Sequence, residues 1–453
     1  MDLLQSGDAC YNRSASPDAP DRRPARLESC EVAMRIYLDS VGCRLNWSEI
    51  ELLAQELARA GHTIVASAAE ADTIAVNSCA VTAQAERKTR HEMRSLHRDN
   101  PQARLAIMGC YATLRPETSA RLPGVRWVIP NAEKERAGDL LTNHAQSPGR
   151  PGEAGETLET MRTRAFVKVQ DGCDNHCTYC IVRSLRGRSR SRLMADVVHE
   201  IQMLVEKADA REVVLTGACL GAYGQDLGYP EGLRSLVEAV LADTDVRRLR
   251  LSSLEPWDIQ ETLFDLWDDS RLCRQFHLPL QSGCDDTLRR MGRRITTEAF
   301  SRLVAAARDQ IPEVAITTDV MVGFPGENQA AFDTSYAFVE KTAFAKIHVF
   351  PYSKRPHTPA SRLPHHIASQ VKEDRARKIR NLARRQRCRY RLRFLGRELP
   401  VLWERQRQDG HWTGWTDNYL RVVADAEQDL MNQITQARIL SAEKGHLRGE
   451  AVL

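Results

Sequence analysis

Six cysteines fall into two groups whose spacing suits the binding of an inorganic cofactor. Cys173, Cys177 and Cys180 form a Cys-x3-Cys-x2-Cys motif in one short stretch of the chain. Three thiolates on one loop can hold three irons of a four-iron cluster and leave the fourth iron open to a ligand from outside the protein. A zinc knuckle is the alternative, but structural zinc sites are usually closed by a fourth Cys or His, a place that His176 offers inside this motif. The motif therefore favours an iron-sulfur cluster.

The other three thiols, Cys43, Cys79 and Cys110, are separated by 36 and 31 residues. Each follows a short apolar run that is typical of a β-strand, and stretches with helical periodicity separate these runs. We expect strands at 35–39, 73–77, 105–108 and 125–129, with helices at 47–60 and 83–97. This alternation predicts an open parallel α/β sheet. Because the ligands of such sheets gather where the strands end, the three thiols are expected to converge on a second metal site.

The composition favours free thiols over disulfides. The chain has 453 residues and 12 cysteines, with 42% hydrophobic and 27% charged residues, which is typical of a folded globular protein. No apolar stretch approaches the ~18 residues that span a bilayer, and the N-terminus lacks the apolar run of a signal peptide. We therefore expect a cytoplasmic protein without membrane contact, in a compartment that keeps thiols reduced and available as metal ligands.

Length and changes in composition predict three domains, with an α/β fold class for the first two. Six strand and helix units in the second domain are too few for a closed eight-stranded barrel and predict a partial (β/α)6 barrel, open on one side. Its expected strands are 164–169, 212–216, 247–251, 274–278, 314–322 and 345–350, and its expected helices include 258–268. Three later β-rich runs, at 398–403, 419–424 and 434–440, predict a small β-barrel. The expected divisions are a disordered extension at 1–33, the N-terminal sheet domain at 34–141, a linker at 142–162, the partial barrel at 163–371, a basic connecting helix at 372–396 and the small β-barrel at 397–453.

The connecting helix carries an uneven share of charge. Although the net charge of the chain is only +4, residues 372–397 contain twelve Lys or Arg and two acidic residues. Such a block predicts contact with a polyanion, and a solvated helix face is the alternative. We select Arg384, Arg385 and Arg387 from this block as candidate RNA-binding residues.

The motifs around the cysteines resemble a known family. Gln-Asp-Gly-Cys-Asp-Asn-His-Cys-Thr-Tyr-Cys-Ile-Val at 170–182 resembles the cluster loop of the radical S-adenosylmethionine (SAM) superfamily, in particular its methylthiotransferase branch. Gly-Cys-Arg-Leu-Asn, Asn-Ser-Cys-Ala-Val-Thr and Gly-Cys-Tyr-Ala around the other three thiols are similar to that branch as well. Further similar motifs are Leu-Ser-Ser-Leu-Glu-Pro at 251–256, Leu-Pro-Leu-Gln-Ser-Gly at 278–283 and Val-Gly-Phe-Pro-Gly-Glu at 322–327. The resemblance covers nearly everything from Met34 onward.

The resemblance implies an enzyme with two 4Fe-4S clusters. Cys173, Cys177 and Cys180 would hold the cluster that binds and cleaves SAM, and the other three thiols would hold an auxiliary cluster whose open iron carries sulfur. Residues implied to bind SAM are Tyr179, Thr216, Gly217, Glu255 and Gln281. For these the alternatives are a packed core tyrosine and polar residues that cap helices at strand ends.

The resemblance also implies tRNA as a partner, an electron donor of the flavodoxin type, and no DNA. The C-terminal barrel resembles the RNA-binding TRAM domain, in which Trp403, Trp412, Trp415 and Tyr419 either stack on bases or fill the core. Motifs such as His-Val-Phe-Pro-Tyr-Ser-Lys-Arg at 348–355 resemble the branch that methylthiolates N6-threonylcarbamoyladenosine at position 37. The carboxylate of that nucleoside needs a cation, for which Arg183, Arg186, Arg188, Arg190 and Arg192 are candidates. Alternatives are an isopentenyladenosine or ribosomal-protein methylthiotransferase, and a non-enzymatic iron-sulfur protein that binds RNA or senses redox state.

Overall fold

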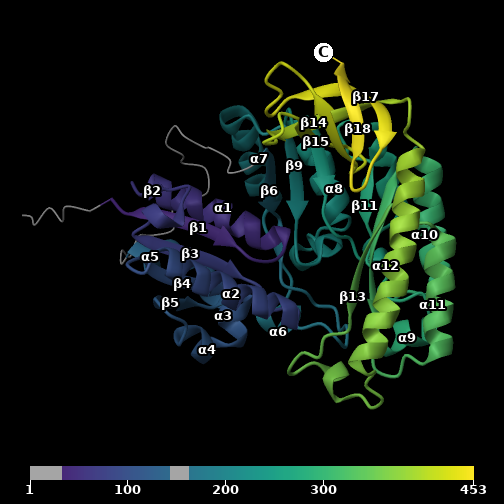
Figure 1. Cartoon of the computed structure of the whole chain (residues 1–453), viewed down its shortest axis with the longest axis horizontal. Coiled ribbons are helices and arrows are strands. Elements are labelled where there is room, and N and C mark those ends of the chain that lie inside the picture. Colours follow the sequence, from purple (N-terminus) through teal and green to yellow (C-terminus); the bar gives the residue numbers. More distant parts are fainter. Residues whose placement is uncertain (1–32, 143–162, 453) are drawn as a thin grey trace, which may run out of the picture. The chain divides into compact units, whose positions relative to one another are not determined.

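Figure 1 shows the computed structural model of the chain, which describes residues 33–142 and 163–452. The expected disordered extension and the expected linker lie outside these ranges, except for Ala33 and Thr142. Met34–Leu453 forms one compact unit. None of the helices in the described ranges is long and apolar enough to cross a membrane.

The N-terminal domain is an open parallel sheet, as its alternating pattern predicts. Its strands, in the order β2-β1-β3-β4-β5, are β1 (Arg35–Ser40), β2 (Thr63–Ile64), β3 (Thr73–Ser78), β4 (Arg104–Gly109) and β5 (Val125–Ile129). All six residues of the central strand β3 are buried, since helices cover both faces of such a sheet. Helix α1 (Arg44–Arg59) packs Ile50, Leu53 and Leu57 against β1, and helix α2 (Ala83–Asp99) begins where the Thr82 side chain accepts from Ala85 N. Each of β1, β3 and β4 therefore ends beside one of the predicted thiols.

The central domain is a partial barrel of six parallel strands. The strands are β6 (Arg164–Lys168), β9 (Glu212–Thr216), β10 (Arg248–Leu251), β11 (Gln275–His277), β12 (Ala315–Val322) and β13 (Lys346–Pro351). They form the sheets β10-β9-β6 and β11-β12-β13, which isolated parallel bridges join at Leu249 and Leu272 and at Ser253 and His277. The outer layer contains α7 (Met194–Ala208), α8 (Gly232–Asp243), α10 (Thr297–Gln310) and α11 (Gln329–Thr342). No pairing joins β6 to β13 in the described residues, so the barrel is open between them.

The last elements are a long helix and a closed barrel. Helix α12 (Ser369–Leu392) packs along β13 and leads into the barrel, drawn in yellow in Figure 1. The barrel closes in the order β14-β15-β16-β18-β17, with β14 (Glu398–Gln406), β15 (Trp412–Thr416), β16 (Arg421–Asp425), β17 (Ile434–Ala442) and β18 (Leu447–Val452). Both the parallel sheet domain and the small β-barrel thus match the expected fold class.

Several expected elements differ from the structure. The expected helix at 258–268 is mainly the 3-10 segment Glu261–Asp268, whose buried Leu263 and Phe264 are adjacent and not spaced by a helical turn. Strands β15 and β18 have no counterpart among the three expected β-rich runs, because Gly414 and Gly449 interrupt their apolar alternation. Tyr419, expected within a strand, lies in a turn with a φ of 65°.

Candidate active site

The loop that carries the Cys-x3-Cys-x2-Cys motif follows β6 and is fixed by backbone hydrogen bonds. Cys173 N donates to Gly187 O (3.1 Å), Cys180 N to Cys177 O (3.0 Å) and Thr178 N to Met291 O (2.8 Å). Gly172 has a φ of 71°, and a Cβ there would lie 1.8 Å from the carbonyl oxygen of Arg188, so only glycine fits. Three thiols are thereby presented by one rigid loop.

These thiols line a cavity of about 360 Å³ at the carboxyl ends of the barrel strands. The cavity brings together the three motif cysteines with three of the residues predicted to bind SAM, namely Tyr179, Glu255 and Gln281. Gln281 has a φ of 72°, and its buried Oε1 has no hydrogen-bond partner. A buried acceptor of this kind is normally satisfied by a bound group. The cavity therefore fits a polar cofactor beside the thiols.

Thr216 and Gly217, the other two residues predicted to bind SAM, are not among the residues that line this cavity. Thr216 ends β9 and is 2% exposed. A Cβ on Gly217 would lie 2.9 Å from Gln170 Oε1, so this glycine allows a close approach of β9 to the cluster loop. Both residues lie next to the cavity residue Ala218, and their predicted contact with SAM remains a prediction.

The cavity also contains residues that the sequence did not single out. Asp319 and Met321 on β12 and Phe350 on β13 line it. The Glu255 carboxylate is paired with buried Arg293 (Nη1 to Oε2, 2.7 Å). Asp319, Met321 and Phe350 could have been found in the sequence, because they lie near the carboxyl ends of their strands, Asp319 and Met321 at alternate positions. No local feature of the sequence relates Arg293 to Glu255.

Cys43, Cys79 and Cys110 follow the carboxyl ends of β1, β3 and β4 and lie near one another. A Cβ on Gly42 would lie 2.7 Å from Cys79 Cβ, which shows how closely the first loop approaches the second. Burial raises the pKa of Cys79 to about 12, and the neighbouring Cys43 and Cys110 add to that increase. In residues 33–142 and 163–452, no three His, Cys, Asp or Glu side chains lie close enough to bind a single metal ion. This spacing is compatible with a cluster, in which each thiolate binds a different iron.

A buried network of charges supports this second set of thiols. Arg186, from the cluster loop, donates through Nη1 to Glu49 Oε1 (2.8 Å) and Asp171 Oδ1 (2.9 Å). Lys134 and Lys168 also pair with Glu49. Burial acts to raise the pKa of Glu49, but these cations outweigh burial and hold that pKa well below its usual range. Three cations face two carboxylates in this network. Burial raises the pKa of the Cys43 thiol, and the positive charge of Arg186 opposes that rise.

This network corrects part of the expected substrate contact. Arg186 is bound to Glu49 and Asp171, and Arg192 is paired with Glu200 (2.5 Å), so neither is free to bind a substrate carboxylate. Arg186 is buried and therefore must be paired, whereas Arg192, whose side chain is 22% exposed, pairs with a carboxylate of α7.

The remaining cysteines also differ from one another. Cys219, Cys273 and Cys284 are buried. The Cys219 thiol donates to Asp258 Oδ2 (3.5 Å), and its proximity to Cys173 lowers the pKa of Cys173. Cys388 is exposed on α12.

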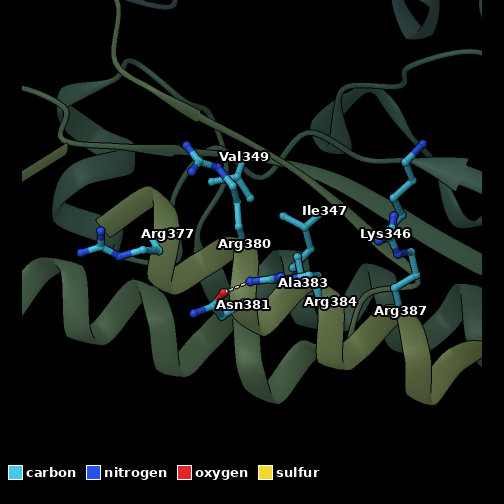
Figure 2. A pocket seen from close by; sticks show the side chains of 9 residues that line it. All are labelled: Lys346, Ile347, Val349, Arg377, Arg380, Asn381, Ala383, Arg384 and Arg387. Carbon is cyan, nitrogen blue, oxygen red and sulfur yellow. Dashed lines mark hydrogen bonds between the residues drawn. The ribbon is translucent and has the colours of Figure 1, made fainter. Parts of the chain in front are cut away.

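The basic helix forms one wall of a groove. Figure 2 shows the lining side chains of a hollow of about 530 Å³ between β13 and α12. The cations that line it are Lys346, Arg377, Arg380, Arg384 and Arg387. The four arginines recur at helical spacing, a signal that was readable in the sequence. Of the three arginines predicted to bind RNA, Arg384 and Arg387 lie in this groove, whereas Arg385 binds Tyr336 Oη (3.0 Å) on α11.

The four barrel aromatics have different roles. Trp403 and Trp412 are buried in the core of the β-barrel, at 0% and 4% exposed. Trp415 and Tyr419 instead stack on each other with ring centroids 4.8 Å apart, and Trp415 Nε1 donates to Glu404 (2.9 Å).

Comparison with known proteins gives the family. A model of the Radical SAM superfamily matches residues 167–339, and a model described as Uncharacterized protein family UPF0004 matches residues 35–129. The chain is 36% identical over 396 residues to the threonylcarbamoyladenosine tRNA methylthiotransferase MtaB of Thermotoga maritima, which covers 85% of this chain and 90% of the relative. The chain belongs to the radical SAM methylthiotransferase family. It is therefore an enzyme, which excludes the non-enzymatic alternative.

Other members of this family lie at similar distances. MtaB of Bacillus subtilis is 32% identical over 435 residues, covering 92% of this chain and 96% of the relative. A tRNA-2-methylthio-N(6)-dimethylallyladenosine synthase of Dictyoglomus thermophilum is 30% identical over 436 residues, covering 92% and 98%. The solved structure of the radical SAM methyltransferase TsrM from Kitasatospora setae, at 15% identity, has a TM-score of 0.53 over 73% of this chain and 75% of that chain, which shows the radical SAM fold.

Proposed function

We propose that this methylthiotransferase converts N6-threonylcarbamoyladenosine at position 37 of tRNA, next to the anticodon, to its 2-methylthio derivative. The observation that carries the proposal is that the cavity lined by the motif cysteines is also bordered by the loop that follows Cys79 in the N-terminal domain. The motif cysteines line it from the barrel, and Val81 and Thr82, just after Cys79, line it from the N-terminal domain. On this proposal a nucleobase in the cavity lies between the motif cysteines and the loop that follows Cys79, so activation of a C–H bond and delivery of sulfur act on the same carbon.

The two sets of thiols fit two 4Fe-4S clusters, with SAM on the one held by Cys173, Cys177 and Cys180. When bound, these groups supply the 5′-deoxyadenosyl radical and the sulfur. The chain positions them: Gln281 offers its buried Oε1 to a donor on the cofactor, and Tyr179 walls the cavity. Apolar walls such as Phe350 and Met321 exclude water, which protects a reactive intermediate from side reactions.

The RNA contacts of this proposal lie outside the cavity. The groove between β13 and α12 binds backbone phosphates through Arg384 and Arg387, and the C-terminal barrel acts as a TRAM-like RNA-binding domain. A tRNA substrate places the enzyme in the cytoplasm. An electron donor of the flavodoxin type supplies the electron that cleaves SAM.

The alternative substrate is the isopentenyl nucleoside, since relatives named for it are 30% identical to this chain. An isopentenyl group needs an apolar slot, whereas a threonylcarbamoyl group ends in a carboxylate and needs cations. Arg44 and Lys346 both lie against the ring of Tyr419, and neither forms an ion pair with a carboxylate in the described residues. This charge favours the threonylcarbamoyl nucleoside over both the isopentenyl nucleoside and a ribosomal protein.

The test is mass spectrometry of tRNA nucleosides from cells that lack the gene. Loss of the methylthio-threonylcarbamoyl nucleoside, restored by the wild-type gene and by Arg302→Gln but not by Cys177→Ala, is the expected result. Arg302 is 67% exposed and pairs with Glu298, so it serves as a matched surface control. Loss of the methylthio-isopentenyl nucleoside instead, or an unchanged nucleoside profile, would overturn the proposal.

A further inference from the structure

The turn between β15 and β16 places one tyrosine against the partial barrel. Tyr419 has a φ of 65°, and its turn is fixed by Thr416 Oγ1, which donates to Asn418 Oδ1 (2.6 Å) and accepts from Leu420 N (2.9 Å). Trp415 stacks on the Tyr419 ring at an interplanar angle of 23°. A strained backbone conformation that is held by this many contacts is typical of a functional position.

Cations from three parts of the chain converge on this ring. Arg44, at the start of α1, donates through Nη2 to Tyr419 Oη (3.0 Å). Arg250 on β10 and Lys346 on β13 lie 5.2 and 5.4 Å from the ring centroid. Burial acts to raise the pKa of Tyr419, but the cations outweigh burial and lower that pKa to about 8. The tyrosine therefore marks a region of strongly positive potential.

Some of the positive charge near this ring is neutralised by carboxylates. Arg250 pairs with Glu212 (Nε to Oε1, 2.7 Å). The carboxylate of Asp319, on β12, pairs with His277 (3.3 Å). Within the described ranges neither Arg44 nor Lys346 has a carboxylate within ion-pair distance, while burial and the cations Arg387, Arg44 and Arg391 lower the pKa of Lys346. Partly buried cations without a counter-ion form a site for an anion from outside the chain.

The strand register connects this anion site to the reaction cavity. Residues Lys346, His348 and Phe350 point to one face of β13 and pair with Thr317, Asp319 and Met321 of β12. Phe350, Met321 and Asp319 line the cavity. Lys346 lies four residues below Phe350, about 13 Å along the strand. Arg44 directly follows Cys43, so it approaches the same interior from the auxiliary thiols. A base held in the cavity can therefore extend a polar substituent of several bonds toward both cations.

We propose that Arg44 and Lys346 bind the carboxylate of the threonylcarbamoyl group, with Tyr419 as the positioning residue that holds Arg44. This inference rests on the proposed function and identifies the residues that select its nucleoside. Figure 2 shows Lys346 at the end of the basic groove beside Arg387. The groove thus leads from the phosphate contacts on α12 to the carboxylate contact inside the barrel.

The test uses the full-length holoenzyme and three anticodon stem-loop RNAs. One carries N6-threonylcarbamoyladenosine at position 37, the second carries the same nucleoside with its carboxylate converted to a carboxamide, and the third carries unmodified adenosine. Binding is measured by fluorescence anisotropy without reductant, and methylthiolation is measured separately. We expect the wild type to bind the carboxylate RNA roughly 10- to 100-fold more tightly than the carboxamide RNA, the effect of one charge-assisted hydrogen bond.

Arg44→Gln and Lys346→Gln should each remove most of this preference and leave the affinity for the unmodified RNA within about twofold, while Arg302→Gln keeps the preference. Tyr419→Phe should weaken the preference for the carboxylate RNA less than Arg44→Gln does, because the aromatic ring beside Arg44 remains. Iron content is measured for every variant because Arg44 adjoins Cys43, and Lys346→Gln serves as the variant away from the thiols. If the variants lost affinity equally for all three RNAs, the two cations would contact phosphates, and the inference would be wrong. It would also be wrong if both variants kept the wild-type preference for the carboxylate RNA over the carboxamide RNA. A wild type that methylthiolates none of these three RNAs, but does methylthiolate a fourth stem-loop that carries isopentenyladenosine, would instead overturn the proposed function.

Discussion

Arg186→Met tests whether the buried charge network joins the N-terminal sheet to the cluster loop. The Arg186 side chain is 4% exposed, and Glu49, its main partner, is 5% exposed. Met has a similar length and keeps most of the packing, so the substitution mainly removes the charge and its hydrogen bonds. In this variant Glu49 keeps its ion pairs with Lys134 and Lys168. Asp171 keeps an ion pair with Lys168, in which Nζ and Oδ2 are 3.8 Å apart.

The size of the effect follows from this burial. Removal of one partner from a buried pair costs about 3–5 kcal/mol. Because Lys134 and Lys168 still neutralise Glu49, we expect the lower end, a decrease of about 3 kcal/mol in the free energy of unfolding at pH 7. Arg302→Gln breaks an exposed pair with Glu298 on α10 and should cost no more than about 0.5 kcal/mol.

The pH dependence gives a second measurement of the same network. The folded pKa of Glu49 lies below its unfolded value of about 4.3, so its contribution to stability is complete above that pH and is lost as the pH falls toward the folded pKa. Without Arg186, the pKa of Glu49 in the folded state is lowered less. The stability difference between wild type and Arg186→Met should therefore shrink below about pH 4.

Urea unfolding followed by circular dichroism, under anaerobic conditions and at matched iron content, measures both effects. A difference between wild type and Arg186→Met below about 1 kcal/mol at pH 7, or equal to that of Arg302→Gln, would refute the argument that the network is buried and unscreened. So would a difference that grows as the pH falls.

Three further predictions concern the thiols, the extension and the RNA groove. Replacement of Cys173, Cys177 and Cys180 by Ala should leave about four irons per chain, as should replacement of Cys43, Cys79 and Cys110, and iron and zinc analysis that finds one zinc in either variant would contradict the assignment. Deletion of residues 1–33 should change neither iron content nor turnover, because none of the predicted cluster, SAM or RNA-binding residues lies in that segment; a large loss of turnover would show that it matters. Arg384→Gln and Arg387→Gln should each reduce the slope of log affinity for tRNA against log salt by roughly 0.7 to 0.9, whereas Arg385→Gln, whose arginine binds Tyr336, should reduce it less, and equal slopes for all three would favour a solvated helix face.

The positions of the thiols in the fold were predictable from the sequence because each depends on local features. The motif cysteines lie on one loop, and Cys43, Cys79 and Cys110 each follow an apolar run that forms a strand. Parallel topology then brings the ends of those strands to the same edge of the sheet. The 3-10 segment Glu261–Asp268 was not predictable in the same way, since its composition is compatible with an α-helix and its conformation depends on packing.

The choice among arginines could not be made from the sequence. Arg183 to Arg192 lie close to the cluster loop along the chain, and proximity in sequence suggested them as partners for the substrate carboxylate. The structure pairs Arg186 and Arg192 with carboxylates of the protein. Whether an arginine is neutralised depends on residues far away in sequence, such as Glu49, which is 137 positions from Arg186.

Neutralisation by a carboxylate of the protein also distinguishes cations that stabilise the fold from cations that are available to bind the substrate. Arg44 and Tyr419 are 375 positions apart, and Lys346 comes from a third part of the chain. A folded protein neutralises nearly all the cations it buries, because an unpaired buried charge lowers its stability. Arg250 and Arg186 follow that rule, whereas the partly buried Arg44 and Lys346 have no carboxylate within ion-pair distance among the described residues. An enzyme that keeps this positive charge at a cost in stability is built to receive an anion there, and a carboxylate on the modified base supplies one.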